Sequence, residues 1–179
     1  TYYDERDFKN AEYFLMQYLA KYPQGRDVGL SVDLIMDSYN QREDFKGLQV
    51  VGKKIVDNKL LASSIRNNVS EIIKQAEFRK IQTNITDFSS ENYSQELLKF
   101  AQKYKGTNLG DRALFEAFTS LKSKKDPGAY IPGEELLLRH GNSQYAKQVT
   151  LEMGKMALLT ADFRRAAKYF EIYSSKYPK

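Results

Sequence analysis

Residues 162–178, which read DFRRAAKYFEIYSSKYP, decide the fold of this chain. Residues 7–23 read DFKNAEYFLMQYLAKYP, so an Asp-Phe pair, an alanine and a final Lys-Tyr-Pro occur at the same spacing in two stretches that are 155 residues apart. In both stretches apolar side chains recur at i, i+3, i+4 and i+7, which is the period of an amphipathic α-helix. The match between two distant helical stretches predicts an internal repeat.

Weaker copies of this stretch begin at 44–45, 92–93 and 129–130. The aromatic residues that mark the five copies are Phe8, Phe45, Tyr93, Tyr130 and Phe163. A helical pattern precedes each of the last four, over about 26–41, 62–83, 109–125 and 144–160. Because one hairpin cannot cover both of its own faces, such units stack on their neighbours. We therefore expect an all-α fold, one helix followed by four helical hairpins, in which residues 1–179 form a single array.

The composition narrows the classes of function. The 179 residues are 41% hydrophobic, which is enough for a sizeable core, and they carry a formal net charge of +5. Because there is no cysteine and only one histidine, disulfides, thiol catalysis and multi-histidine metal centres are excluded. No window approaches the roughly 20 apolar residues that a membrane span needs. We therefore expect no enzyme activity in this chain, no cofactor and no metal.

Residues 47–54, GLQVVGKK, nearly spell a phosphate-binding loop. Lys54 stands where that motif needs a serine or threonine to hold magnesium, and no strand pattern precedes the segment. Leu48, Val51 and Ile55 keep a helical phase through it. We therefore expect a packing helix here and not a nucleotide site.

The last hairpin resembles a tetratricopeptide repeat (TPR), whose pattern is W-x2-L-G-x2-Y…A-x3-F…P. Four positions match this pattern in type at the correct spacing: Gly154, Ala166, Phe170 and Pro178. The Trp, Leu and Tyr positions of the pattern are filled by Thr150, Met153 and Ala157. The resemblance is strong over residues 144–178 and loose in the middle of the chain. It implies a TPR-like α-α superhelix of about four helical hairpins plus an N-terminal helix.

Within that family, residues 142–178 are similar to bacterial cell-envelope proteins of the Tol-Pal coordination and outer-membrane-assembly lipoprotein kind. The motifs that carry this likeness are Asn142-Ser-Gln-Tyr-Ala146, Met153-Gly154, Ala161-Asp-Phe163-Arg-Arg-Ala166 and Tyr177-Pro178. The resemblance implies a bacterial protein and favours the periplasm or cell envelope over the cytoplasm. Because the chain starts at Thr1 and stops in a helix-like stretch, we expect it to be a fragment of a longer chain.

The TPR resemblance also implies a function, a non-enzymatic protein-protein interaction scaffold that binds a peptide or protein partner on its concave face. In TPR arrays the first helix of each hairpin lines this face. The positions so implied are Leu30, Asp33, Asp37, Phe115, Phe118, Lys122, Lys125, Gln148, Leu151, Lys155, Leu158 and Leu159. We expect the apolar members either to be exposed, as on a peptide-binding surface, or to be covered by a neighbouring hairpin. The lysines favour an acidic partner segment.

The last helical stretch has a further implication. Tyr169, Phe170 and Ile172 lie on it, where a following repeat would normally pack. Without a polar capping helix, such an apolar strip stays exposed. We therefore expect self-association through residues 162–177, or coverage of the strip by another part of a longer chain.

Two other functions stay open at this point. The chain is alternatively a helical accessory domain of a larger, peptidoglycan-processing enzyme of the cell envelope, with the active site outside these residues. Helical-repeat RNA binding would need a basic inner face, and Asp33 and Asp37 on the expected groove argue against it. Because positive and negative side chains are mixed along the chain, we expect no nucleic-acid partner.

Overall fold

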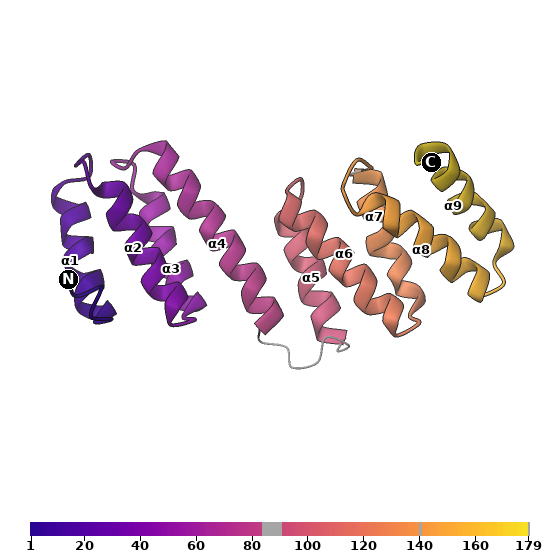
Figure 1. Cartoon of the computed structure of the whole chain (residues 1–179), viewed down its shortest axis with the longest axis horizontal. Coiled ribbons are helices and arrows are strands. Elements are labelled where there is room, and N and C mark those ends of the chain that lie inside the picture. The colour runs from indigo at the N-terminus through magenta and orange to yellow at the C-terminus, as the bar shows by residue number, and fades with distance from the viewer. Residues whose placement is uncertain (84–90, 140, 179) are drawn as a thin grey trace. The chain divides into compact units, whose positions relative to one another are not determined.

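The structure is a computed structural model that describes residues 1–83, 91–139 and 141–178. Within these residues the chain is helical and contains no strand, so the prediction of an all-α protein is confirmed. The helices are α1 (Phe8–Lys21), α2 (Val28–Gln41), α3 (Phe45–Asp57), α4 (Ser63–Thr83), α5 (Glu91–Lys103), α6 (Asn108–Ser123), the 3-10 helix η1 (Pro127–Ala129), α7 (Tyr130–Arg139), α8 (Ala146–Leu159) and α9 (Phe163–Lys176) (Figure 1).

The chain divides into two compact units, Thr1–Lys80 and Ile81–Lys179, and the boundary falls inside α4. Consecutive helices pack on one another within each unit, α1 on α2 and α2 on α3 in the first, and α5 to α9 in order in the second. The single array over residues 1–179 stays a prediction.

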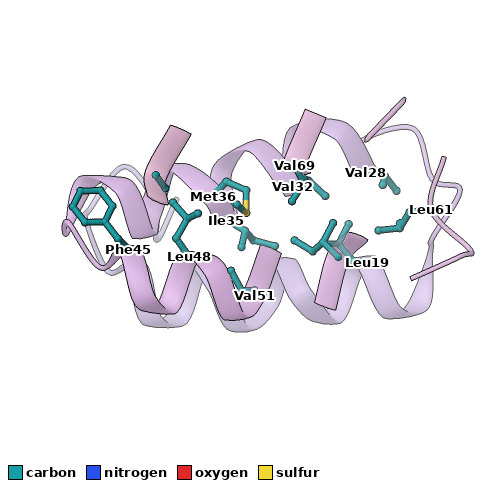
Figure 2. Close-up of a cluster of buried hydrophobic side chains, with 12 residues drawn as sticks. Leu19, Val28, Val32, Ile35, Met36, Phe45, Leu48, Val51, Leu61 and Val69 are labelled. Carbon is teal, nitrogen blue, oxygen red and sulfur yellow. The ribbon is translucent and has the colours of Figure 1, made fainter. Parts of the chain in front are cut away.

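The first unit is built around α2. Its buried side chains include Val28, Val32, Ile35 and Met36, which lie on one stripe of the helix because their spacing follows the helical period. These residues meet apolar side chains from α1, α3, α4 and the connection between α3 and α4 in one cluster, shown in Figure 2: Leu19, Phe45, Leu48, Val51, Ile55, Leu61, Val69 and Ala76. The expected packing helix over residues 47–54 is confirmed, since this segment lies within α3 and Leu48, Val51 and Ile55 are buried.

The second unit holds two close helix approaches that depend on glycine. A Cβ atom at Gly133 of α7 would lie 2.7 Å from Sδ of Met153 and 3.2 Å from Cδ2 of Phe118. A Cβ atom at Gly154 of α8 would lie 2.7 Å from Cε1 of Phe170 on α9. Gly154 and Ala166 are both buried, as the repeat pattern predicts.

One turn geometry occurs four times in the chain. The left-handed residues Arg6, Glu43, Lys125 and Ala161 have φ values of 58°, 54°, 57° and 57°. An aspartate follows each of them, and its backbone N–H donates to the carbonyl five residues earlier, over 2.8, 3.0, 3.1 and 2.9 Å for Asp7, Asp44, Asp126 and Asp162. This six-to-one hydrogen bond is the Schellman pattern that ends α-helices.

The same aspartates also start the next helix. The side chains of Asp7, Asp44 and Asp162 each accept a hydrogen bond from the backbone N–H three residues later, which makes them N-caps of α1, α3 and α9. The Asp-Phe pairs of the sequence therefore mark the junction at which a helix-ending turn passes into a new helix. Four of the five aromatic residues that mark the copies, Phe8, Phe45, Tyr130 and Phe163, are the first residues of helices, whereas Tyr93 lies inside α5, which begins at Glu91.

Candidate functional site

The predicted partner-binding residues of α2 lie on one face of the helix. Leu30 and Asp33 are exposed and Asp37 is half-buried. Their spacing of three and four residues stacks them one turn above another. Leu30 is 61% exposed, which agrees with the expectation of an exposed member at this position.

A pocket opens beside these residues in the first unit. It has a volume of about 280 Å³. We call it the α2–α4 pocket, and its lining residues are Asp33, Met36, Asp37 and Asn40 of α2, Leu48 of α3, and Ile72, Gln75, Ala76 and Arg79 of α4. The buried members Met36, Leu48 and Ala76 belong to the hydrophobic core, so the pocket has an apolar floor and a polar rim.

Hydrogen bonds hold the polar rim in place. Nη1 of Arg79 donates to Oδ1 of Asn40 over 3.1 Å, which connects α4 to α2. Nδ2 of Asn68 donates to Oδ1 of Asp33 over 3.5 Å. The Tyr3 hydroxyl donates to the Asp37 carboxylate. The rim therefore combines two carboxylates with amide groups and one guanidinium, a set that can bind both donors and acceptors of a peptide.

Tyr3 gives this site a measurable titration. The hydrogen bond to Asp37, together with burial, raises the pKa of Tyr3 from 10.0 to about 12. A group whose pKa is higher in the folded state stabilises the fold below its unfolded pKa. This contribution should therefore be complete below pH 10.0 and fall as the pH rises towards about 12. The Cζ chemical shift of Tyr3 in carbon-labelled protein measures this pKa.

The Asp37→Asn variant should return the pKa of Tyr3 towards its ordinary value, because an amide oxygen carries no negative charge. Asp57→Asn, at the exposed end of α3, is the matched control and should leave the titration unchanged. A Tyr3 that titrates near 10.0 in the unmodified chain would contradict the contact.

One residue of the second unit was predicted as a partner contact but is buried. Phe118 was expected among the partner-binding positions, but it is 1% exposed and packs at Gly133 of α7, so it cannot touch a partner. The reason is a shift in helix register. Ala161 and Lys125 occupy the same place in the recurring turn, and they are 36 residues apart. Phe118 is therefore the counterpart of Gly154, which is also buried against a second helix.

The 3-10 helix η1 causes this shift. Asp162 directly precedes Phe163, whereas Pro127–Ala129 lies between Asp126 and Tyr130. An alignment on the aromatic residues Tyr130 and Phe163 is therefore wrong for the preceding helix by the length of η1. Phe115 is half-buried and stacks on Tyr145, with ring centroids 4.6 Å apart and planes inclined by 15°.

The predicted lysines of the second unit are partly neutralised. Nζ of Lys122 lies 2.9 Å from Oε2 of Glu152, and Nζ of Lys155 lies 2.8 Å from Oε1 of the same carboxylate. Hydrogen bonds from Lys155 and Lys122 lower the pKa of Glu152. The negative charge of Glu152 thus offsets part of the positive charge of the two lysines, which weakens their expected attraction for an acidic segment. Lys125 is exposed in the left-handed turn after α6.

The remaining predicted residues lie on α8. Gln148, Lys155 and Leu158 are exposed, and Leu151 is half-buried. Leu159, at the end of the helix, is 87% exposed. Two of the five apolar residues predicted for this unit's groove, Leu158 and Leu159, are therefore open to solvent, as expected of a contact surface.

The expected apolar strip on α9 is wrong in its main members. Tyr169 is 2% exposed, and Phe170 packs at Gly154. Ile172 is half-buried. Because α9 uses these side chains within its own unit, they do not form an open strip, and self-association through residues 162–177 stays a prediction without that support. Phe163, at the start of α9, is 69% exposed.

Sequence reasoning missed the pocket residues Gln75 and Arg79 of α4, and it missed Tyr3. The α4 helix spans 21 residues where α2 and α8 span 14, so positions could not be transferred to it from the last hairpin. Tyr3 stands three residues before the left-handed Arg6, as Asn40 stands three residues before the left-handed Glu43. Both therefore lie just before the turn that leads into an Asp-Phe pair. That interval is the signal that could have found it.

Among the described residues, no group of three or more His, Asp or Glu side chains could hold a metal ion. None of the described helices is both long enough and apolar enough to cross a membrane. Comparisons of the chain with protein families, with curated proteins and with solved structures found no match.

Proposed function

We propose that this chain is a non-enzymatic interaction scaffold of the TPR type, which binds a peptide segment of a partner on the first helices of its hairpins. The observation that carries the proposal is the α2–α4 pocket. It lies between two helices that the repeat pattern makes the first helices of successive hairpins, and it contains Asp33 and Asp37, both chosen from the sequence as contacts.

The recurring turns support the TPR type. A left-handed residue followed by an N-capping aspartate joins α2 to α3 and also α8 to α9, so these two hairpins have the same kind of connection. The small residues Gly154 and Ala166 are buried where that family has small residues. Repeated junctions of one geometry are typical of stacked helical repeats.

The chemistry of the pocket supports an extended peptide as the ligand. A peptide offers a backbone N–H and C=O at each residue, and the Asn40 and Gln75 amides can pair with both groups. Asp33 is exposed and can accept from a lysine or arginine side chain of the partner. Met36 and Leu48 form an apolar floor for one neighbouring side chain.

Selection of random displayed peptides on the full chain tests the proposal. The peptides that bind should lose about tenfold in affinity for the Asp33→Asn variant, as measured by fluorescence anisotropy, because the amide cannot form the charge-assisted hydrogen bond to a lysine or arginine of the peptide. Asp57→Asn is the matched control, since it makes the same change at an exposed aspartate outside the pocket.

Selected peptides that bind Asp33→Asn and Arg79→Ala as tightly as the unmodified chain would contradict the proposal. Amide chemical shifts of labelled protein supply the second readout. The signals of α2 and α4 should move on peptide addition, and those of the turn between α8 and α9 should not.

A further inference from the structure

A second pocket lies in the other unit, between α7 and α9, which the proposed groove does not use, and Thr150 of α8 also lines it. It has a volume of about 360 Å³. Leu137 and Leu138 of α7 and Ile172 of α9 supply its apolar wall, and Lys168, Lys176 and Tyr177 also line it. We call it the α7–α9 pocket. None of the partner-binding residues that the sequence predicted lines it.

A buried hydroxyl without a partner marks this pocket. The hydroxyl oxygen of Tyr177 is buried and has no hydrogen-bond partner among the described residues. The Thr150 hydroxyl, which lines the same pocket, donates to the Ala146 carbonyl over 2.8 Å. Buried polar atoms are nearly always paired, and an unpaired one destabilises the protein. Burial raises the pKa of Tyr177, against a smaller opposing effect of the Thr150 hydroxyl. A tyrosine is protonated at neutral pH, so this hydroxyl can donate to an acceptor.

Positively charged side chains outnumber negatively charged ones around the pocket. Lys168 and Lys176 form no ion pair within the described part of the chain, and Nζ of Lys176 donates to the Gly141 carbonyl over 2.6 Å. Glu134, the acid among the lining residues, already accepts from the Tyr169 hydroxyl over 2.7 Å. An apolar wall with two such ammonium groups and a hydroxyl donor is complementary to an apolar group that carries carboxylates nearby.

We propose that the α7–α9 pocket docks an acidic peptide segment of a partner protein, in which an apolar side chain is flanked by aspartate or glutamate. The apolar side chain packs against Leu137, Leu138 and Ile172. A carboxylate accepts from the Tyr177 hydroxyl, and neighbouring carboxylates pair with Lys168 and Lys176. The inference is independent of the proposed function, since the α2–α4 pocket carries two aspartates and selects the opposite charge.

A library of labelled peptides, in which leucine, isoleucine or phenylalanine is randomised among glutamate and aspartate, is the probe. Its members should bind the full chain in fluorescence anisotropy, and their affinity should fall as salt is added. Two matched libraries, with lysine in place of the acids or alanine in place of the apolar residues, should not bind. Amide signals of α7, α9 and Tyr177 should shift with the acidic library.

Three variants separate specific docking from attraction by charge alone. Lys168→Glu should weaken binding about tenfold, because it places a like charge beside the bound acids. Arg164→Glu is the matched control, since it makes the same charge change on the same exposed helix outside the pocket and should leave binding nearly unchanged. Tyr177→Phe should weaken binding by about threefold while the melting temperature stays the same or rises, since an unpaired buried hydroxyl is removed.

Several results would overturn the proposal. One is the absence of binding by any acidic peptide at concentrations up to about 1 mM, which corresponds to about 4 kcal/mol of binding free energy. Another is equal weakening by Lys168→Glu and Arg164→Glu, which would indicate charge attraction without a pocket. A third is light scattering that shows a dimer which Lys168→Glu dissociates, because the occupant would then be a second copy of the chain.

Discussion

Replacing Phe118 by alanine should lower the free energy of unfolding of the second unit by about 3–5 kcal/mol, the range for a buried phenylalanine truncated to alanine. The side chain is 1% exposed, and its ring fills the space that Gly133 leaves open on α7. Because packing at such a site relaxes only in part, the lost ring leaves a cavity as well as lost burial. Urea unfolding of the full chain, followed by circular dichroism, measures the change.

Phe163→Ala is the matched control for Phe118→Ala. Phe163 is 69% exposed, and a substitution at an exposed site should change the free energy of unfolding by no more than about 0.5 kcal/mol. Hydrogen exchange should show that Phe118→Ala lowers the protection of α6 and α7 amides. If both phenylalanine variants unfold at the same urea concentration, Phe118 does not lie in the core.

Replacing Gly154 by leucine should cost about 1–3 kcal/mol through overpacking. The first added carbon alone would lie 2.7 Å from the ring of Phe170, and the rest of the leucine side chain has to enter the same contact between α8 and α9. The ring or the helix must therefore move. Thermal and urea unfolding of the full chain give the size of the effect.

Gly29→Leu is the matched control for Gly154→Leu. No heavy atom lies within 4 Å of the position that a Cβ at Gly29 would take, so the same substitution on α2 meets open space. Glycine is unfavourable in a helix, so this variant should be neutral or more stable by up to about 1 kcal/mol. If Gly154→Leu and Gly29→Leu were equally stable, the close approach of α9 to Gly154 would be contradicted.

The helix starts could be predicted because one local motif determines them. An aspartate that ends one helix through its backbone N–H and begins the next through its carboxylate needs no distant partner, and it is followed by phenylalanine at Asp7, Asp44 and Asp162. For the same reason α2 and α8 share one register, since the left-handed residues Glu43 and Ala161 each precede such a pair directly.

The position of Phe118 could not be predicted in this way. Its assignment depended on counting back from Tyr130, and the 3-10 helix Pro127–Ala129 makes that count wrong. The left-handed residue Lys125 is the better reference point, but a lysine carries no sign of that conformation in its side chain. A glycine there would have marked it.

The two pockets differ in how many of their lining residues could be predicted from the sequence. Asp33 and Asp37, which line the α2–α4 pocket, stand at positions that the TPR resemblance implies, while Arg79 lies on a longer helix with no counterpart. The α7–α9 pocket depends on a hydroxyl that is buried without a partner, which is a property of packing and has no pattern in the sequence.

The two close approaches of the second unit use opposite arrangements of large and small side chains. The ring belongs to the first helix and the glycine to the second where α6 meets α7, and the order is reversed where α8 meets α9. Because α7 begins at Tyr130 and α9 at Phe163, Ala166 is the counterpart of Gly133. Exchanging α7 and α9 by recombination would therefore place an alanine Cβ in the space beside Phe118 and Met153 that Gly133 leaves open. Shuffling of these hairpins would therefore create a mismatched contact between two helices, even though the hairpins share one kind of connecting turn.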